Sequence, residues 1–249
     1  MQIMADVHTH TVFSHGKGTI EQNVIAAMEK GLKVIGIADH GPGHPAYGVR
    51  RPKVPAMRRE VDRLNRLYHR EIRVILGIEA NLISRSGRLD VPESILPAFD
   101  FVLCGFHRGA LPYGVRDAGR LWLRNAFHPD EDTVQDNTQA YLNALEQYRI
   151  AALCHLGEYI PVDMELIAPA AQAKGALIEI NNRHAKQETA QLKEALSAGA
   201  QFILSSDAHE ADAVGGFERA MALCRQAGVP EGRIVNAAGF AGRRPAWLE

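Results

Sequence analysis

Histidine is the residue type whose placement carries the most chemical information in this sequence. The chain has 249 residues and 11 histidines, and His8 and His10 follow Asp6 in the segment DVHTH. Residues two apart in a β-strand point to the same face, so the two imidazoles can bind one metal ion. One such pair is weak evidence, because chance gives about 0.5 H-x-H matches in a chain of this composition.

The same residue types recur where other short apolar segments end. Five further segments end in, or run directly into, the following side chains: Asp39 and His40, Glu79, His107, His155, and Asp207 with His209. In a parallel barrel the carboxyl ends of all strands open onto one face, so side chains remote in sequence converge there. Six of the seven expected strands deliver His, Asp or Glu to this face, which chance does not readily produce. The pattern predicts a metal site, and imidazole and carboxylate ligands favour Zn, Mn or Fe.

Seven short apolar segments have the length and the β-branched or aromatic content of strands. They are residues 3–7, 34–38, 74–78, 101–106, 150–154, 177–180 and 202–204. Helix-length segments separate most of them. Thr19 and Gln22 form a capping-box sequence at the start of one helix, and Gly31, Gly175 and Gly199 stand where helices are expected to end. Strand, helix and glycine in repetition predict parallel βαβ units in an α/β fold. We expect a seven-stranded barrel, with an open doubly wound sheet as the alternative.

Two connections, residues 41–55 and 108–131, are longer than ordinary loops. The second carries four arginines around a short apolar stretch at residues 121–123, and we expect it to form a lid over the leaving group of the substrate. The alternative is that the apolar residues pack this segment onto the barrel while the arginines are solvated. Of the remaining histidines, His44 and His128 are expected to be solvated polar residues in these loops, and His69 a surface cation favoured by the carboxyl end of a helix.

Composition excludes several classes of protein. The net charge is −1, so no overall basic field attracts long nucleic acid. The three cysteines, Cys104, Cys154 and Cys224, show no C-x-x-C spacing and are expected to be reduced and buried. No signal peptide is recognisable and no apolar run approaches the roughly 20 residues that span a membrane, which favours a cytoplasmic protein. Without a linker or a low-complexity segment, residues 1–249 are expected to form a single domain.

The segments around the expected ligands resemble those of a known family. In chain order they read DVHTHTVFSHG, IADHGPG, LGIEANL, CGFHRG, LCHLG, EINN and SSDAHEADAVG. From about residue 5 to residue 240 the chain resembles the PHP (polymerase and histidinol phosphatase) superfamily, and most closely its small stand-alone phosphatases of the YcdX type. The resemblance implies a distorted (β/α)7 TIM-like barrel, a trinuclear metal site at the carboxyl ends of the strands, and compatibility with a homotrimer.

The resemblance also assigns ligands to three divalent ions. His8, His10, Glu79 and Asp207 would hold the first ion. Glu79 would bridge to a second ion, completed by His107 and His155, and His15, His40 and His209 would hold the third. Three divalent ions against two carboxylates leave a formal excess of positive charge, which suits a hydroxide and a phosphate dianion.

Other residues near the expected site receive supporting roles. Asp6 and Asp39 are expected to accept hydrogen bonds from imidazole N–H groups. Asp39 and His184 are candidates for protonating the leaving group, and Glu79 and Asp207 for the catalytic carboxylates. The expected substrate contacts are Lys17, Arg108, Arg183 and His184. Strand alternation predicts that the side chains of Cys154 and His155 point in opposite directions.

We therefore expect a metal-dependent phosphatase acting on a small phosphomonoester. A phosphodiesterase or exonuclease of the same superfamily is one alternative. An amidohydrolase-like enzyme cutting C–N bonds is another, although such sites use a bridging carboxylated lysine and no strand here ends in lysine. A non-catalytic metal-binding module would lack ligands. The sequence departs from the family pattern after the fifth strand. Relatives usually read His-Pro-Gly there, whereas His155 is followed here by Leu156, Gly157, Glu158 and Tyr159. The charge of Glu158 is expected to repel phosphate or shape selectivity for the substrate.

Overall fold

Seven parallel strands form a nearly closed barrel in the computed structural model, which describes residues 1–127, 129–184 and 189–249. His128 therefore lies outside the described residues. The strands pair in chain order and are β1 (Ala5–Thr9), β2 (Val34–Ile37), β3 (Arg73–Asn81), β4 (Phe101–Gly105), β5 (Ala152–Leu153), β6 (Leu177–Asn181) and β7 (Phe202–Ser205). The seven expected strands and the TIM-like architecture are confirmed. β3 is longer than expected, and β5 is only two residues long.

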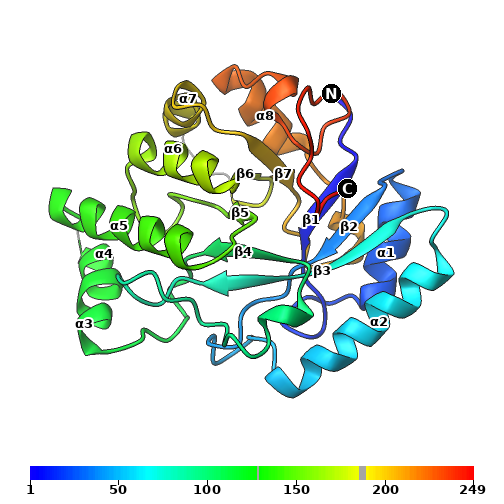
Figure 1. Cartoon of the computed structure of the whole chain (residues 1–249), viewed down its shortest axis with the longest axis horizontal. Coiled ribbons are helices and arrows are strands. Elements are labelled where there is room, and N and C mark those ends of the chain that lie inside the picture. Colours follow the sequence, from blue (N-terminus) through cyan, green and yellow to red (C-terminus); the bar gives the residue numbers. More distant parts are fainter. Residues whose placement is uncertain (128, 185–188) are drawn as a thin grey trace.

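The long helices lie around the outside of the strands (Figure 1). They are α1 (Ile20–Glu29), α2 (Val54–Leu67), α5 (Glu131–Gln147), α6 (Met164–Lys174), α7 (Thr189–Ser197) and α8 (Glu218–Ala227). Shorter helical segments are Arg51–Lys53, Leu96–Ala98, α3 (Val115–Asp117), the π-helix Ala118–Leu123, α4 (Arg124–Phe127), Ala211–Ala213 and Glu231–Arg233. The capping box of Thr19 and Gln22 is present at α1, and Gly31, Gly175 and Gly199 all have positive φ. None of the helices in the described ranges has the length and hydropathy needed to cross a bilayer.

The amino end of the barrel is filled by aromatic side chains. The ring of Phe101 lies so close to the backbone of Gly36 and Gly77 that an added Cβ would come within 2.8 and 2.2 Å of it. Trp247, near the end of the chain, stacks on Phe101 with ring centroids 5.2 Å apart, and Leu248 is buried beside them. Since this end is packed, the opposite end of the barrel, where the strands finish, is left for polar side chains.

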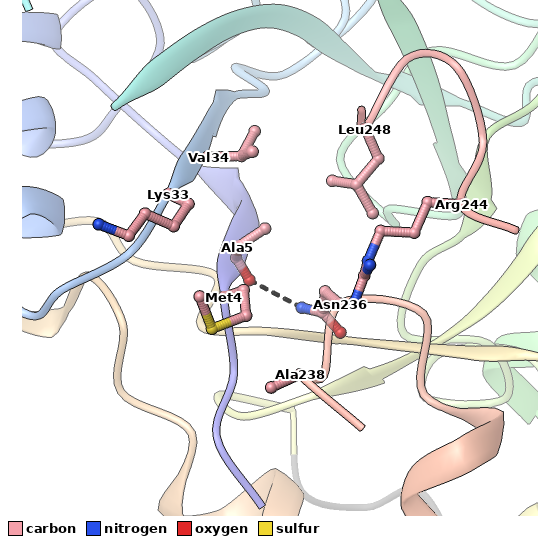
Figure 2. A pocket seen from close by; sticks show the side chains of 8 residues that line it. All are labelled: Met4, Ala5, Lys33, Val34, Asn236, Ala238, Arg244 and Leu248. Atoms are coloured by element: carbon pink, nitrogen blue, oxygen red, sulfur yellow. Dashed lines mark hydrogen bonds between the residues drawn. The ribbon is translucent and has the colours of Figure 1, made fainter. Parts of the chain in front are cut away.

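Strands β1 and β7 lie next to each other without a continuous ladder of backbone hydrogen bonds, and the junction between them is called the seam. One isolated bridge pairs Thr9 with Ala208. Below it the side chain of Asn236 donates from Nδ2 to the carbonyl oxygens of Ala5 and Leu204, each at 2.7 Å, and its Oδ1 accepts from the Leu204 N–H at 3.1 Å. Figure 2 shows Asn236 reaching Ala5 at the edge of a cavity of about 360 Å³. A buried amide side chain thus replaces part of the missing strand pairing.

Within the loop predicted at residues 108–131, the described residues 120–124 pack onto the barrel and α5. Leu121 is fully buried, and Trp122 lies 4.9 Å from the ring of Phe106 and donates to the carbonyl of Arg108. Arg120 and Arg124 form ion pairs with Asp136 of α5 at 3.3 and 3.6 Å. These contacts agree with the packing alternative, although two of the arginines are paired rather than simply solvated.

Candidate metal centre

Glu79 lies at the centre of the polar side chains at the carboxyl end of the barrel. Because β3 continues to Asn81, the carboxylate of Glu79 is held inside the mouth of the barrel, where it is 1% exposed. Its oxygens approach imidazole nitrogens of five histidines: His8 at 3.3 Å, His10 at 3.7 Å, His40 at 2.7 Å, His107 at 3.5 Å and His155 at 2.7 Å. Burial alone raises the pKa of Glu79, but these imidazoles outweigh burial and hold it well below its ordinary value.

Asp207 forms a second centre, beside the first. Its oxygens lie 3.2 Å from Nε2 of His10, 3.2 Å from Nε2 of His184 and 3.4 Å from Nδ1 of His209. Asp207 and His155 both have a left-handed backbone, with φ of 54° and 35°. This conformation costs a residue other than glycine about 1–3 kcal/mol, and it is typical of functional sites. In both residues the backbone turns as the strand ends, and the side chain enters the site.

Several triads of donor atoms lie within 4.8 Å of one another and are suitable for holding a metal ion. Among the described residues these include His8, His10 and Asp207; His40, Glu79 and His107; and His10, His40 and His209. His15 belongs to none of the described triads, but its ring centroid lies 4.8 Å from that of His40 and 4.2 Å from that of His209. All nine expected ligands therefore converge on one end of the barrel, although His40 stands closer to Glu79 than the family assignment implies.

The buried donor atoms fit bound cations. In the described part of the chain, seven buried side-chain atoms of the expected ligands form no hydrogen bond of acceptable geometry, although some of them face one another at ion-pair distance, as Nδ1 of His40 and Oε2 of Glu79 do at 2.7 Å. They are Nε2 of His8, both ring nitrogens of His10 and of His40, Oε2 of Glu79 and Oδ1 of Asp207. Burying an unpaired polar atom is costly, so a concentration of them at one point needs a compensating partner. Imidazole nitrogens and carboxylate oxygens turned toward each other are the donor set that Zn, Mn and Fe take.

Glu179 of β6 also lies at the site, a position that the sequence pattern does not predict. Its Oε1 lies 2.6 Å from Nδ1 of His8, and its Oε2 accepts from the N–H of His155 at 2.8 Å. Burial raises the pKa of Glu179, but His8 and His155 lower it further, so the net shift is downward. The sequence feature that could have identified Glu179 is a carboxylate between Ile178 and Ile180 in an otherwise apolar strand. It indicates a polar group facing the inside of the barrel.

Asn81 orients His107, another expected ligand, in the way that Glu179 orients His8. Its Oδ1 lies 2.7 Å from Nδ1 of His107, while its Nδ2 donates to Asp90 at 2.6 Å. Like Glu179, Asn81 holds an imidazole from behind, which directs the other ring nitrogen toward the site.

The roles expected for Asp6 and Asp39 are wrong. Asp39 is fully buried and accepts hydrogen bonds from the backbone and hydroxyl of Thr11 and from the hydroxyl of Ser14. Asp6 accepts from the N–H groups of Ser206 and Gly215. Both carboxylates therefore hold the loops that carry ligands, rather than the imidazoles themselves. With its oxygens occupied in this way, Asp39 is not placed to protonate a leaving group.

Cys154 and His155 do not point in opposite directions as strand alternation predicts. Sγ of Cys154 lies 3.4 Å from Oε1 of Glu79, the same oxygen that His155 approaches at 2.7 Å. The reason is that β5 ends at Leu153 and the left-handed backbone of His155 turns its side chain back. Burial raises the pKa of the Cys154 thiol well above its ordinary value.

Two of the four expected substrate contacts lie at the site. His184 lies between Asp207 and the ring of His155, with ring centroids 4.9 Å apart, and the guanidinium of Arg183 contacts His209. Lys17 is 75% exposed and is paired with Glu210, while Arg108 is exposed next to His107.

Aromatic side chains border the site on two sides. Tyr47 stacks on His44 with centroids 3.4 Å apart and lies 4.3 Å from His15. His44 is 5% exposed, so its expected position in solvent is wrong; the stacking and the neighbouring chain at Gly109 bury it. On the other side Tyr159 lies 5.7 Å from His155. Burial raises the pKa of Tyr159 to about 12, so its hydroxyl remains a donor.

Comparison with known proteins gives the family. The sequence profile of the PHP domain matches residues 6–205. A probable phosphatase of Thermoanaerobacter sp. (strain X514) is 31% identical over 252 residues, covering 95% of this chain and 91% of the relative, and a probable phosphatase of Shewanella loihica is 31% identical over 251 residues, covering 95% and 90%. Among solved structures, histidinol phosphate phosphatase of Lactococcus lactis, crystallised with Zn, L-histidinol and phosphate, superimposes with a TM-score of 0.62 at 16% identity, covering 95% of this chain and 97% of that one. At that identity the superposition shows the fold alone. The match to the sequence profile and the identity to the sequence relatives show the family: the chain belongs to the PHP domain family.

Proposed function

We propose that this chain is a metal-dependent phosphatase that hydrolyses a small phosphomonoester with three divalent ions, Zn, Mn or Fe. The observation that carries the proposal is the convergence of nine candidate ligands around Glu79 and Asp207, with seven of their buried side-chain atoms lacking a hydrogen bond of acceptable geometry among the described residues. The names of the relatives, probable phosphatases, support it, as do the zinc and phosphate in the Lactococcus lactis crystal.

Bound divalent ions would supply positive charge for the phosphoryl group and a water of lowered pKa. The chain's own residues position these partners. Glu79 is the carboxylate placed between two groups of imidazoles, and Glu179 and Asn81 keep the rings of His8 and His107 turned inward. This arrangement provides preorganisation, which is the main protein contribution to phosphoryl transfer.

Two further side chains are assigned to the substrate. Arg183 reaches Asp207 and His209 from the rim, where a planar guanidinium can pair with phosphate oxygens. Two side chains are candidates for protonating the leaving group. His184 lies at the site, with its Nε2 3.2 Å from Asp207. The carboxylate of Asp39 instead accepts hydrogen bonds from Thr11 and Ser14.

The test is a panel of phosphomonoesters and phosphodiesters assayed on metal-replete protein, with metal analysis of the same sample. The proposal expects hydrolysis of monoesters and two to three metal equivalents. Preferential cleavage of diesters would instead indicate a phosphodiesterase or exonuclease, and cleavage of amides an amidohydrolase-like activity. Metal binding without turnover of any substrate would indicate a non-catalytic module. Light scattering on the same sample tests the homotrimer with which the family resemblance is compatible.

A further inference from the structure

The thiol of Cys154 lies inside the metal centre, and the proposed function gives it no role. Four donor atoms surround Oε1 of Glu79. Nε2 of His155 lies 2.7 Å from this oxygen, and Sγ of Cys154 lies 3.4 Å from it. Nε2 of His8 and Nε2 of His107 lie 3.3 and 3.5 Å from the same oxygen. The sulfur therefore stands beside three imidazole nitrogens of expected ligands, in the cluster of donor atoms that would surround an ion.

Cys154 belongs to two groups of donor atoms that are close enough to hold a metal ion. Glu79 and His155 complete the first group, and His8 and Glu179 complete the second, with the atoms of each group within 4.8 Å of one another. An independent observation at the same place is that Nε2 of His8, in a side chain that is 0% exposed, forms no hydrogen bond of acceptable geometry. A buried nitrogen in this state needs a partner from outside the chain, and the sulfur lies beside it.

Two features of the backbone bring the sulfur to this point. The left-handed conformation of His155, with φ of 35°, allows its side chain and that of Cys154 to approach the same oxygen. Gly105, the last residue of β4, makes room for both. A Cβ at Gly105 would lie 2.8 Å from Sγ of Cys154 and 2.6 Å from Cε1 of His155. Two neighbours in sequence can thus donate to one ion, which a regular strand does not permit.

The surroundings disfavour a thiolate unless a cation is bound. Burial, together with the negative charges of Glu79 and Glu179, raises the pKa of Cys154. A bound divalent ion is the largest charge in such a site, and a thiol that coordinates it gives up its proton, here to solvent. A thiolate is also a soft ligand, which suits zinc much better than manganese. Sulfur at this position would therefore bear on which metal the site takes.

We propose that Cys154 is a sulfur ligand of the ion that Glu79, His107 and His155 would hold, and that it makes this position selective for zinc over manganese. The inference rests on the metal centre of the proposed function and adds a ligand that the family resemblance does not assign. One thiolate, one carboxylate and two imidazoles form a set of four ligands of the types that zinc takes.

The experiment examines metal-loaded native protein and Cys154→Ser by spectroscopy. With cobalt(II), the native protein should show a thiolate-to-metal charge-transfer band in the near ultraviolet. With zinc, X-ray absorption should give a zinc–sulfur distance of about 2.3 Å. Cys154→Ser should lose both signals and keep its circular dichroism spectrum. Cys104→Ser is the matched control, because Cys104 is equally buried but, among the described residues, belongs to no group of donor atoms, and it should keep both signals.

Metal affinities measured by competition with a chelator test the selectivity. Loss of a residue that only orients a ligand costs about 10–100-fold in affinity, so Cys154→Ser should lower zinc affinity by at least that factor. Manganese affinity should fall less, because manganese gains little from sulfur. Equal losses for the two metals would overturn the selectivity.

The outcomes separate this proposal from the phosphatase. Bound metal without a sulfur signal in the native protein, or a sulfur signal that persists in Cys154→Ser, would overturn the role of Cys154 and leave the phosphatase intact. A sulfur signal in a protein that hydrolyses no phosphomonoester would support the ligand and overturn the phosphatase, and a protein that binds no metal would overturn both. If Cys154→Ser does not fold, the signal of the native protein, retained in Cys104→Ser and in Cys224→Ser, supports Cys154, and its absence from the native protein refutes the proposal.

Discussion

Nδ1 of His8 lies 2.6 Å from Oε1 of Glu179, although the two residues are 171 positions apart in the chain. The other oxygen of Glu179 accepts from the backbone of His155. One carboxylate on β6 thus holds a histidine of β1 and the turn after β5. A carboxylate behind a histidine ligand fixes the tautomer and the orientation of the ring, so we expect Glu179 to determine how His8 faces the metal centre.

Replacing Glu179 with Gln should weaken metal binding. The amide keeps the shape but cannot accept at both positions with the strength of a carboxylate, so the ring of His8 is less well oriented. We expect metal affinity to fall by about 10–100-fold, measured by competition with a chelator of known affinity. Glu194→Gln, on the exposed face of α7, is the control and should bind metal as the native protein does. Unchanged affinity in Glu179→Gln would refute the orienting role.

Replacing Glu79 with Gln should remove the bridge between two groups of imidazoles. The variant keeps the shape of the side chain but loses the charge that allows two cations to lie close together in a pocket of low dielectric. We expect metal content to fall below two equivalents and phosphatase activity to fall by about a hundred-fold or more, with the circular dichroism spectrum retained. Near-normal turnover together with full metal content would rule out bridging.

Arg183 and Lys17 should differ in their effect on substrate binding. Arg183 contacts His209 at the rim of the site, whereas Lys17 is occupied by Glu210 at the surface. Arg183→Ala should raise KM for a phosphomonoester by about ten-fold, the loss expected for one charge-assisted contact. Lys17→Ala should change KM less than about two-fold, because an exposed ion pair contributes little. Equal effects of the two substitutions would contradict the assignment of Arg183.

Asn236 should be important for stability rather than for chemistry. Its amide is buried and joins β1 to β7 through Ala5 and Leu204, so truncation leaves several backbone groups without partners. We expect Asn236→Ala to lower the free energy of unfolding by about 3 kcal/mol in urea titrations. Gln139→Ala, which removes an exposed amide from α5, should change it by less than about 0.5 kcal/mol. A small effect of Asn236→Ala would show that the strands hold the seam by themselves.

The sequence alone determined the seven parallel strands and the end of the barrel at which the ligands lie. Both depend on local patterns: apolar runs of strand length, glycine at helix ends, and His, Asp or Glu at or just after the ends of six of the seven runs. These patterns indicate where a side chain enters the molecule, because parallel strands all finish at one end. The tertiary structure decided which side chains meet. It placed Glu179 behind His8, turned Asp39 toward Thr11, buried His44 under Tyr47, and brought Cys154 and His155 to the same oxygen of Glu79. Such contacts depend on which strands are neighbours and on backbone angles just beyond the strand ends, such as the φ of 35° at His155. The periodicity of residue types in the sequence predicts neither of these.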